Sequence, residues 1–131
     1  MSVEILFPGG KKVDALIDGF TVHTDQALAD GGDGMAPPPF SLFLASLGTC
    51  AGIYVKSFCD KRGIFSEGMR LTMDYNYDPV QKMIVKILIQ IHVPPGFPEE
   101  YENAVIKTAS LCAVKRHLSE KIENEITIKR S

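Results

Sequence analysis

The sequence predicts a single α+β domain in which one apolar helix packs on antiparallel strands. Alternating apolar and polar residues, typical of strands, fill residues 3 to 23 and again residues 69 to 93. Between them three prolines precede an apolar stretch, Phe40 to Val55, which is typical of a buried helix. Apolar residues at helical spacing return after Pro98, and a short alternating run ends the chain. The expected order of elements is therefore β-β-β-α-β-β-α-α-β.

The first three strands form an antiparallel meander in this interpretation. Val3, Ile5 and Phe7 alternate with polar residues, and the Pro-Gly-Gly stretch after them turns the chain. A second alternating run ends at Asp18-Gly19, a pair strongly favoured in two-residue hairpin turns, so a third strand is expected from Phe20. The glycine-rich segment GGDGMAPPP that follows lacks the Lys-Ser/Thr pair and the spacing of phosphate-binding loops, and it is interpreted as a surface loop.

The central helix is expected to run to about Arg62 and to stop at Gly63. Its apolar stretch has 16 residues before the first charge at Lys56, fewer than the roughly 18 to 20 that cross a bilayer, and it contains serine, threonine and glycine. The sequence therefore favours the buried centre of a fold over a membrane span.

The second half of the sequence predicts a long β-hairpin, two helices and a last strand. Residues 69 to 77 and 83 to 93 alternate on either side of a turn at Asp78-Pro79. Pro98 followed by two glutamates is a typical helix start. The apolar stripe breaks near Ser110, which is expected to cap a separate short helix beginning around Cys112. Residues 125 to 130 alternate again, with Ile126 and Ile128 expected to face inward.

Composition and charge narrow the range of expected partners and the expected cellular compartment. At 131 residues the chain has the length of one domain. Its net charge is −2, with charges spread along the sequence, so neither nucleic acid nor an anionic membrane is an expected partner. The first residues do not resemble a signal peptide, and a cytoplasmic location is expected. Three cysteines are too few and odd in number for a disulfide framework.

The three cysteines are candidates for redox chemistry or for simple packing. Cys59 follows Cys50 by nine residues, which on a helix places it on the opposite face and about 13 Å away, so the two cannot form a disulfide. If Cys50 has a partner in its own chain, that partner is Cys112, and Cys59 is a bystander. Lys115 and Arg116 follow Cys112 over the same helical face and would favour a thiolate there. A role for Cys50 as a small buried hydrophobic residue remains equally open.

The histidines do not suggest a metal site. His23, His92 and His117 lie far apart in the sequence and lack the spacing of zinc ligands.

The order of elements, the proline-led helix carrying LASLGTC and the later CAVKRHL together resemble the OsmC-like proteins, which include organic hydroperoxide resistance proteins. The resemblance covers nearly the whole chain. It implies an OsmC-like fold, an intertwined homodimer, and a peroxidatic cysteine at Cys50 with a resolving cysteine at Cys112. The implied reaction reduces an organic hydroperoxide to an alcohol and forms a Cys50–Cys112 disulfide. An external dithiol then reduces this disulfide. The reaction needs no metal or organic cofactor.

Three positions depart from the family pattern. Phe40 and Ser41 stand where strongly active members carry a glutamate, and no arginine precedes Arg62, although such members have an activating one in their N-terminal loops. Ala113 replaces the proline after the second cysteine. Lys115, Arg116 and Ser41 are therefore the residues expected to activate the thiol or to line the substrate pocket. The alternative is a non-catalytic or weakly active dimeric OsmC-like protein that binds a small molecule.

Overall fold

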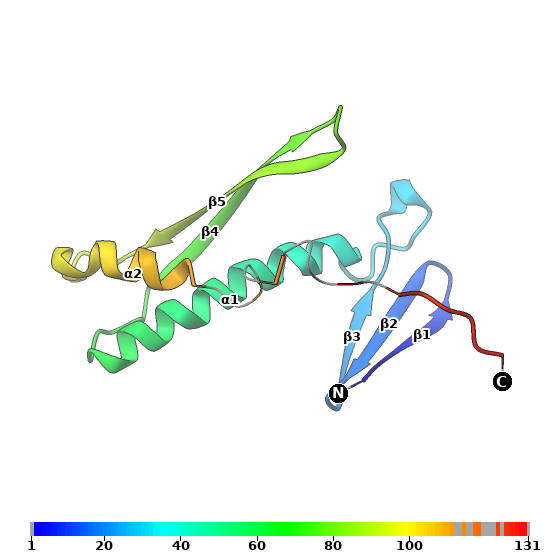
Figure 1. The fold of residues 1–131 in the computed structure, drawn as a ribbon, viewed down its shortest axis with the longest axis horizontal. Coiled ribbons are helices and arrows are strands. Elements are labelled where there is room, and N and C mark those ends of the chain that lie inside the picture. Colours follow the sequence, from blue (N-terminus) through cyan, green and yellow to red (C-terminus); the bar gives the residue numbers. More distant parts are fainter. Residues whose placement is uncertain (1, 112–113, 115–116, 119–122, 124, 131) are drawn as a thin grey trace. The chain divides into compact units, whose positions relative to one another are not determined.

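The structure is a computed structural model that describes residues 2–111, 114, 117–118, 123 and 125–130. The chain forms two compact units, Met1–Ala45 and Ser46–Ser131. Figure 1 shows the first unit from blue to cyan and the second from green to red. The single domain expected from the sequence stays a prediction.

A three-stranded antiparallel sheet makes up most of the first unit. Its strands are β1 (Val3–Gly9), β2 (Lys12–Ile17) and β3 (Phe20–Thr24), in the order β1-β2-β3 (Figure 1). Ile17 pairs with Phe20 across a turn in which Asp18 and Gly19 have φ angles of 49° and 81°. Positive φ at both central residues is the geometry that suits the twist of a two-residue hairpin. The predicted meander and its Asp-Gly turn are confirmed.

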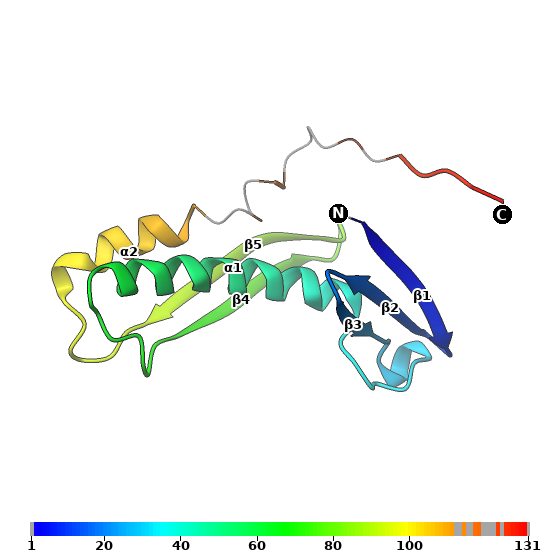
Figure 2. The same ribbon diagram turned by 90° about the horizontal axis from the view of Figure 1, so that it is seen from below.

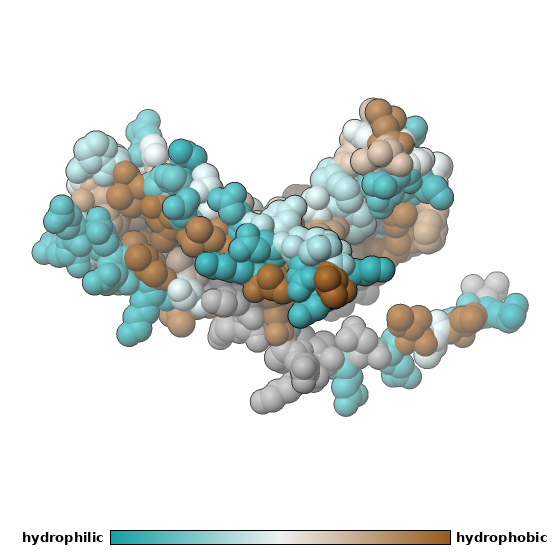
Figure 3. All heavy atoms as spheres, turned by 90° about the horizontal axis from the view of Figure 1, so that it is seen from above, coloured by the Kyte–Doolittle hydropathy of each residue, from teal (hydrophilic) through white to brown (hydrophobic). Residues whose placement is uncertain are grey.

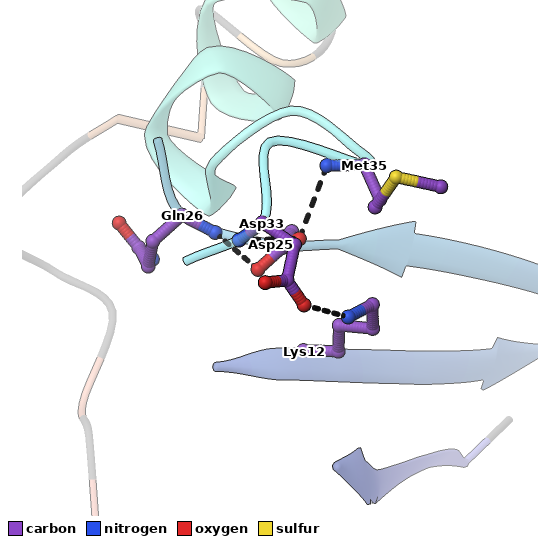
Figure 4. Close-up of polar contacts among 5 residues, drawn as sticks. All are labelled: Lys12, Asp25, Gln26, Asp33 and Met35. Atoms are coloured by element: carbon purple, nitrogen blue, oxygen red, sulfur yellow. Dashed lines mark hydrogen bonds and ion pairs between the residues drawn. The ribbon is translucent and has the colours of Figure 1, made fainter. Parts of the chain in front are cut away.

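The loop after β3 is organised by one buried carboxylate. Asp25, only 1% exposed, accepts hydrogen bonds from the backbone N–H groups of Gln26 (2.7 Å), Asp33 (3.3 Å) and Met35 (3.1 Å) (Figure 4). These bonds, first of all the one from Met35, hold the pKa of Asp25 below its ordinary value. Lys12 donates to the Asp33 carboxylate at 2.6 Å and ties the loop to β2. These hydrogen bonds therefore give the loop a defined conformation.

Gly32 is the tightest point of this loop. A Cβ atom there would collide with the backbone carbonyl of Gln26 and lie 2.8 Å from the Asp25 carboxylate. Only glycine therefore allows the chain to pass so close to the buried acid. A short 3-10 turn, η1 (Leu28–Asp30), lies between Asp25 and Gly32.

The central helix, α1, spans Pro39–Lys61 and is followed by Gly63 with a φ of 63°, as predicted. It begins in the first unit and lies mostly in the second. Its 23 residues are long and apolar enough to cross a membrane by length and composition, a test that the core helices of many proteins also pass. Its apolar surface is only partly covered within one chain: the most apolar 18-residue window is 28% buried. The expectation of a helix buried on every side is therefore not met by the single chain.

The second unit packs α1 against a hairpin and a shorter helix. Strands β4 (Arg70–Asp78) and β5 (Met83–His92) pair antiparallel, as predicted. A 3-10 turn, η2 (Glu99–Tyr101), leads into α2 (Glu102–Ala109), which lies beside the C-terminal end of α1 in Figures 1 and 2. The buried residues at the centre of this unit are Val55, Phe58, Cys59, Phe97 and Val105.

The α2 region differs from the sequence prediction at both ends. The two glutamates after Pro98 form a 3-10 turn, and the α-helix begins only at Glu102. At the other end the Ser110 hydroxyl donates to the carbonyl of Ile106 at 2.9 Å, so Ser110 closes α2. The separate short helix expected from Cys112 lies mostly outside the described residues, although Val114 is helical.

The prediction of a strand at residues 125–130 is wrong for the single chain. These residues have no strand structure, and Ile126 and Ile128 are 96% and 88% exposed. A strand is stable only when its backbone groups pair with a neighbour, and the second sheet consists of β4 and β5 alone among the described residues. The alternating sequence is thus present without the pairing that would make it a strand.

Candidate functional site

Helix α1 presents its two cysteines in different surroundings. Cys59 is fully buried, and its sulfur lies 3.8 Å from the sulfur of Met69. Burial, and after it the charge of Asp60, raises the pKa of the Cys59 thiol above its ordinary value. Cys50 is half-buried. A thiol must be reachable and able to ionise to act as a nucleophile, so Cys50 meets the first requirement and Cys59 meets neither.

The position of Cys50 on α1 explains this difference. The helix turns Leu47, Ala51, Val55 and Phe58 into the core, and each is 6% exposed or less. Cys50 precedes Ala51 by one residue, which places it about 100° away from that residue around the helix axis. Cys50 thus lies at the edge of the buried face, in agreement with its partial exposure.

The side of α1 roughly opposite Cys50 is open to a neighbour. Cβ atoms added at Gly48 and Gly52 would meet nothing within 4 Å. Glycine costs helix stability compared with alanine. The two glycines, each about 160° from Cys50 around the helix axis, therefore leave space for another molecule or chain on the side of α1 away from the thiol, at a cost in helix stability.

The other predicted site residues are less completely placed. Cys112, Lys115 and Arg116 lie outside the described residues, so the Cys50–Cys112 pairing and the two cations stay predictions. Ser41 lies in the first turn of α1, in the first unit, where its N–H donates to the carbonyl of Pro38 at 3.0 Å.

Two grooves in the second unit were not expected from the sequence. One has a volume of about 780 Å³ and is mainly apolar. It is lined by Leu47 and Ala51 of α1, Ile84 to Ile91 of β5, and Ile106, Ala109, Ser110 and Leu118. The other, of about 520 Å³, lies between α1 and α2 and has Lys61 and Arg62 among its lining residues. The sequence suggested only a helix end for these two cations. The spacing of 11 residues from Cys50 to Lys61, which places both on one side of α1, was the signal that could have pointed to this groove.

Across the described part of the chain, no three His, Cys, Asp or Glu side chains are grouped closely enough to hold a metal ion.

A family model described as OsmC-like protein matches residues 31–127, about three quarters of the chain. The chain belongs to the OsmC-like family. No curated protein sequence matches it significantly. Among solved structures, an osmotic stress induced and detoxification response protein from Psychrobacter arcticus is similar with a TM-score of 0.77 and 17% identity, over 92% of this chain and 89% of that one.

A second similar structure is an organic hydroperoxide resistance protein OsmC from Legionella pneumophila. Its TM-score is 0.57 and its identity 19%, with 88% of each chain covered. At these identities the two structures establish the α+β fold of the OsmC-like family, as the sequence predicted, and the activity is a separate question.

Proposed function

We propose that this OsmC-like protein reduces organic hydroperoxides with Cys50 as the attacking thiol. The observation that carries the proposal is the contrast on α1, where the cysteine of the family motif is half-buried and Cys59 is enclosed in the core. The name of the Legionella pneumophila relative, an organic hydroperoxide resistance protein, supports the substrate class.

The reaction follows from thiol chemistry. The Cys50 thiolate attacks the terminal oxygen of the hydroperoxide, the O–O bond breaks, and the alkoxide takes a proton and leaves as the alcohol. The sulfur, oxidised by two electrons, becomes a sulfenic acid. The Cys112 thiol then attacks this sulfur, water leaves, and a disulfide forms. An external dithiol reduces the disulfide by exchange and becomes a disulfide itself.

A homodimer is part of the proposal. Two-stranded hairpins are marginal alone in water, yet β4 and β5 expose many apolar side chains in the single chain. These are Tyr75, Tyr77, Met83, Val85, Ile87 and Leu88. Figure 3 shows such apolar atoms, in brown, open to solvent among polar ones. A second copy of the chain would cover this surface and the side of α1 that carries Gly48 and Gly52, and sedimentation at micromolar concentration is expected to give twice the mass of the chain.

Mass spectrometry after one equivalent of cumene hydroperoxide tests the chemistry. We expect the protein to lose two hydrogen atoms and to yield a peptide that links Cys50 to Cys112. Cys50→Ser should abolish peroxide consumption, and Cys59→Ala, which removes a thiol of the same helix, should leave it. Unchanged thiols in the wild type, or full activity in Cys50→Ser, would overturn the proposal.

A non-catalytic binding protein is the second candidate. The groove of about 780 Å³ favours it, because drug-sized ligands bind in mainly apolar clefts of this size. Ala51, the neighbour of Cys50, lines this groove, so a ligand there would lie close to the proposed nucleophile. Binding of an apolar ligand without any peroxide consumption would favour this candidate over the enzyme.

A further inference from the structure

The reaction proposed at Cys50 requires a donor for the proton that the departing alkoxide takes up. An alkoxide is a strong base and leaves slowly unless it receives a proton as the O–O bond breaks. The departing oxygen lies just beyond the oxygen that the sulfur attacks. The donor must therefore stand beside Cys50, on the side from which a substrate enters.

Tyr54 lies one helical turn after Cys50. Four residues at 100° each place it about 40° from Cys50 around the axis of α1 and about 6 Å further along. Long side chains on an α-helix point back towards the N-terminus, over the residue three or four positions earlier. By this geometry the phenol of Tyr54 extends over Cys50. Both residues are half-buried and belong to the second compact unit.

The Tyr54 hydroxyl is also available to a substrate. Tyr54 lines the groove between α1 and α2, so a molecule in that groove can meet its side chain. Among the residues that the structure describes, none forms a hydrogen bond with this hydroxyl. A phenol can both donate and accept a hydrogen bond, as a group that gives up a proton and recovers it must do.

The other hydroxyl groups of α1 near Cys50 are placed less well for this task. Ser46, one turn before Cys50, points away from the thiol by the same rule of side-chain direction. Thr49 lies about 100° away around the axis, and its hydroxyl donates to the Ser46 carbonyl at 3.4 Å. Ser57 is on the side of Cys50 but about 10 Å along the axis, beyond the reach of its short side chain. Tyr54 is thus the hydroxyl group of α1 that fits.

We propose that Tyr54 is a catalytic residue that protonates the departing alkoxide. The Cys50 thiolate attacks the terminal oxygen, the O–O bond breaks, and the sulfur, oxidised by two electrons, becomes a sulfenic acid. The phenol proton passes to the alkoxide, which leaves as the alcohol, and the tyrosinate recovers a proton from water. One thiol and one hydroperoxide thus give one sulfenic acid and one alcohol. This inference rests on the proposed function and adds the proton donor to it.

Tyr54→Phe, which removes only the hydroxyl, tests the role with two oxidants of similar size. Cumene hydroperoxide releases an alkoxide, whereas peroxybenzoic acid releases benzoate, a weak base that leaves without a proton. The measurement is the rate constant for a single oxidation of Cys50 in the reduced protein. We expect this rate constant to fall about 100-fold with cumene hydroperoxide and to change less than about threefold with peroxybenzoic acid. Ser57→Ala, which removes a hydroxyl from the same groove, should leave both rate constants unchanged.

The pair of oxidants separates proton donation from other roles of Tyr54. Equal losses with both oxidants, or slower alkylation of Cys50 by iodoacetamide in Tyr54→Phe, would mean that Tyr54 acts on the thiol or on the fold. Either result, or an unchanged rate with cumene hydroperoxide, would overturn the inference and leave the proposed function intact. A wild type in which neither oxidant modifies Cys50 would overturn the proposed function and the role of Tyr54 with it.

Discussion

Each of the two compact units is stabilised internally by a different kind of interaction. In the first unit, the buried carboxylate of Asp25 accepts hydrogen bonds from three backbone N–H groups and so fixes the loop before α1. In the second, Val55, Phe58, Cys59 and their neighbours form an apolar core. A buried carboxylate stabilises its loop only while it is ionised, whereas the buried thiol of Cys59 stabilises the core only while it is neutral. Acid should therefore weaken the first unit and alkali the second.

Loss of the Phe58 ring should have the largest effect on this contrast. Phe58 is 4% exposed, packs edge-on against Tyr101 with ring centres 6.0 Å apart, and carries Arg62 over its face. Phe58→Ala should lower the free energy of unfolding by about 3–5 kcal/mol, measured by urea unfolding, with hydrogen exchange rising chiefly in the second unit.

The control for this change is Phe65→Ala. Phe65 is 85% exposed in the same unit, and its removal should cost less than about 0.5 kcal/mol. Equal losses in the two variants would mean that the apolar core does not hold the second unit.

A methyl group at Gly32 should disturb the first unit instead. The added Cβ would collide with the Gln26 carbonyl beside the Asp25 carboxylate. Gly32→Ala should cost about 1–3 kcal/mol, with increased hydrogen exchange at the amides of Asp33 and Met35. Gly96→Ala is the matched control, since a Cβ there meets nothing within 4 Å. Unchanged protection of the loop amides in Gly32→Ala would count against the arrangement around Asp25.

Gly52→Ala tests whether a second copy covers the side of α1 that carries Gly48 and Gly52. In the single chain the added methyl group meets nothing, so better helix propensity should stabilise the protein by about 1 kcal/mol. If the partner's helix packs closely on this side, as the proposed homodimer requires, the same change should weaken the dimer. Sedimentation and thermal unfolding together distinguish the results, and a stabilised dimer would show that the partner does not contact Gly52.

Local sequence signals predicted most of the secondary structure. Asp18-Gly19, the alternation on either side of Asp78-Pro79 and Gly63 after the apolar stretch each specify backbone geometry through nearby residues. The prediction of a last strand was wrong for the single chain. A strand must pair with a neighbouring strand, and the alternation of Ile126 and Ile128 does not supply one.

The candidate site could be predicted only in part for the same reason. The motif around Cys50 identified the thiol, but the groove at Lys61 and Arg62 needs α2 beside α1, which is a tertiary contact. The role of Asp25 likewise depends on N–H groups up to ten residues away in a folded loop. Sequence patterns specify elements, whereas these sites arise where elements or loop segments meet.

Acid should act first on the loop of the first unit. The pKa of Asp25 lies below its ordinary value of 3.8, so its stabilising contribution is present above that pH and is lost as the pH falls through the folded-state pKa. Hydrogen exchange of the loop at decreasing pH, corrected for intrinsic rates, measures this loss. Asp25→Asn should remove the dependence and Asp30→Asn in the same loop should retain it. An acid response that survives in Asp25→Asn would place its origin elsewhere.

Alkali should act on the core of the second unit through Cys59, with the smallest expected effect of the series. Burial and Asp60 raise the thiol pKa above 9.0, whereas Lys56 and Arg62 oppose the shift. The unfolded chain therefore releases the proton first as the pH rises, so the stabilisation is complete below about pH 9 and declines above it. Urea unfolding between neutral pH and mild alkali should show this decline in the wild type and less of it in Cys59→Ala. Alkylation of Cys59 in the folded protein as fast as that of Cys50 would contradict its enclosure, because a core thiol can react only when the second unit opens.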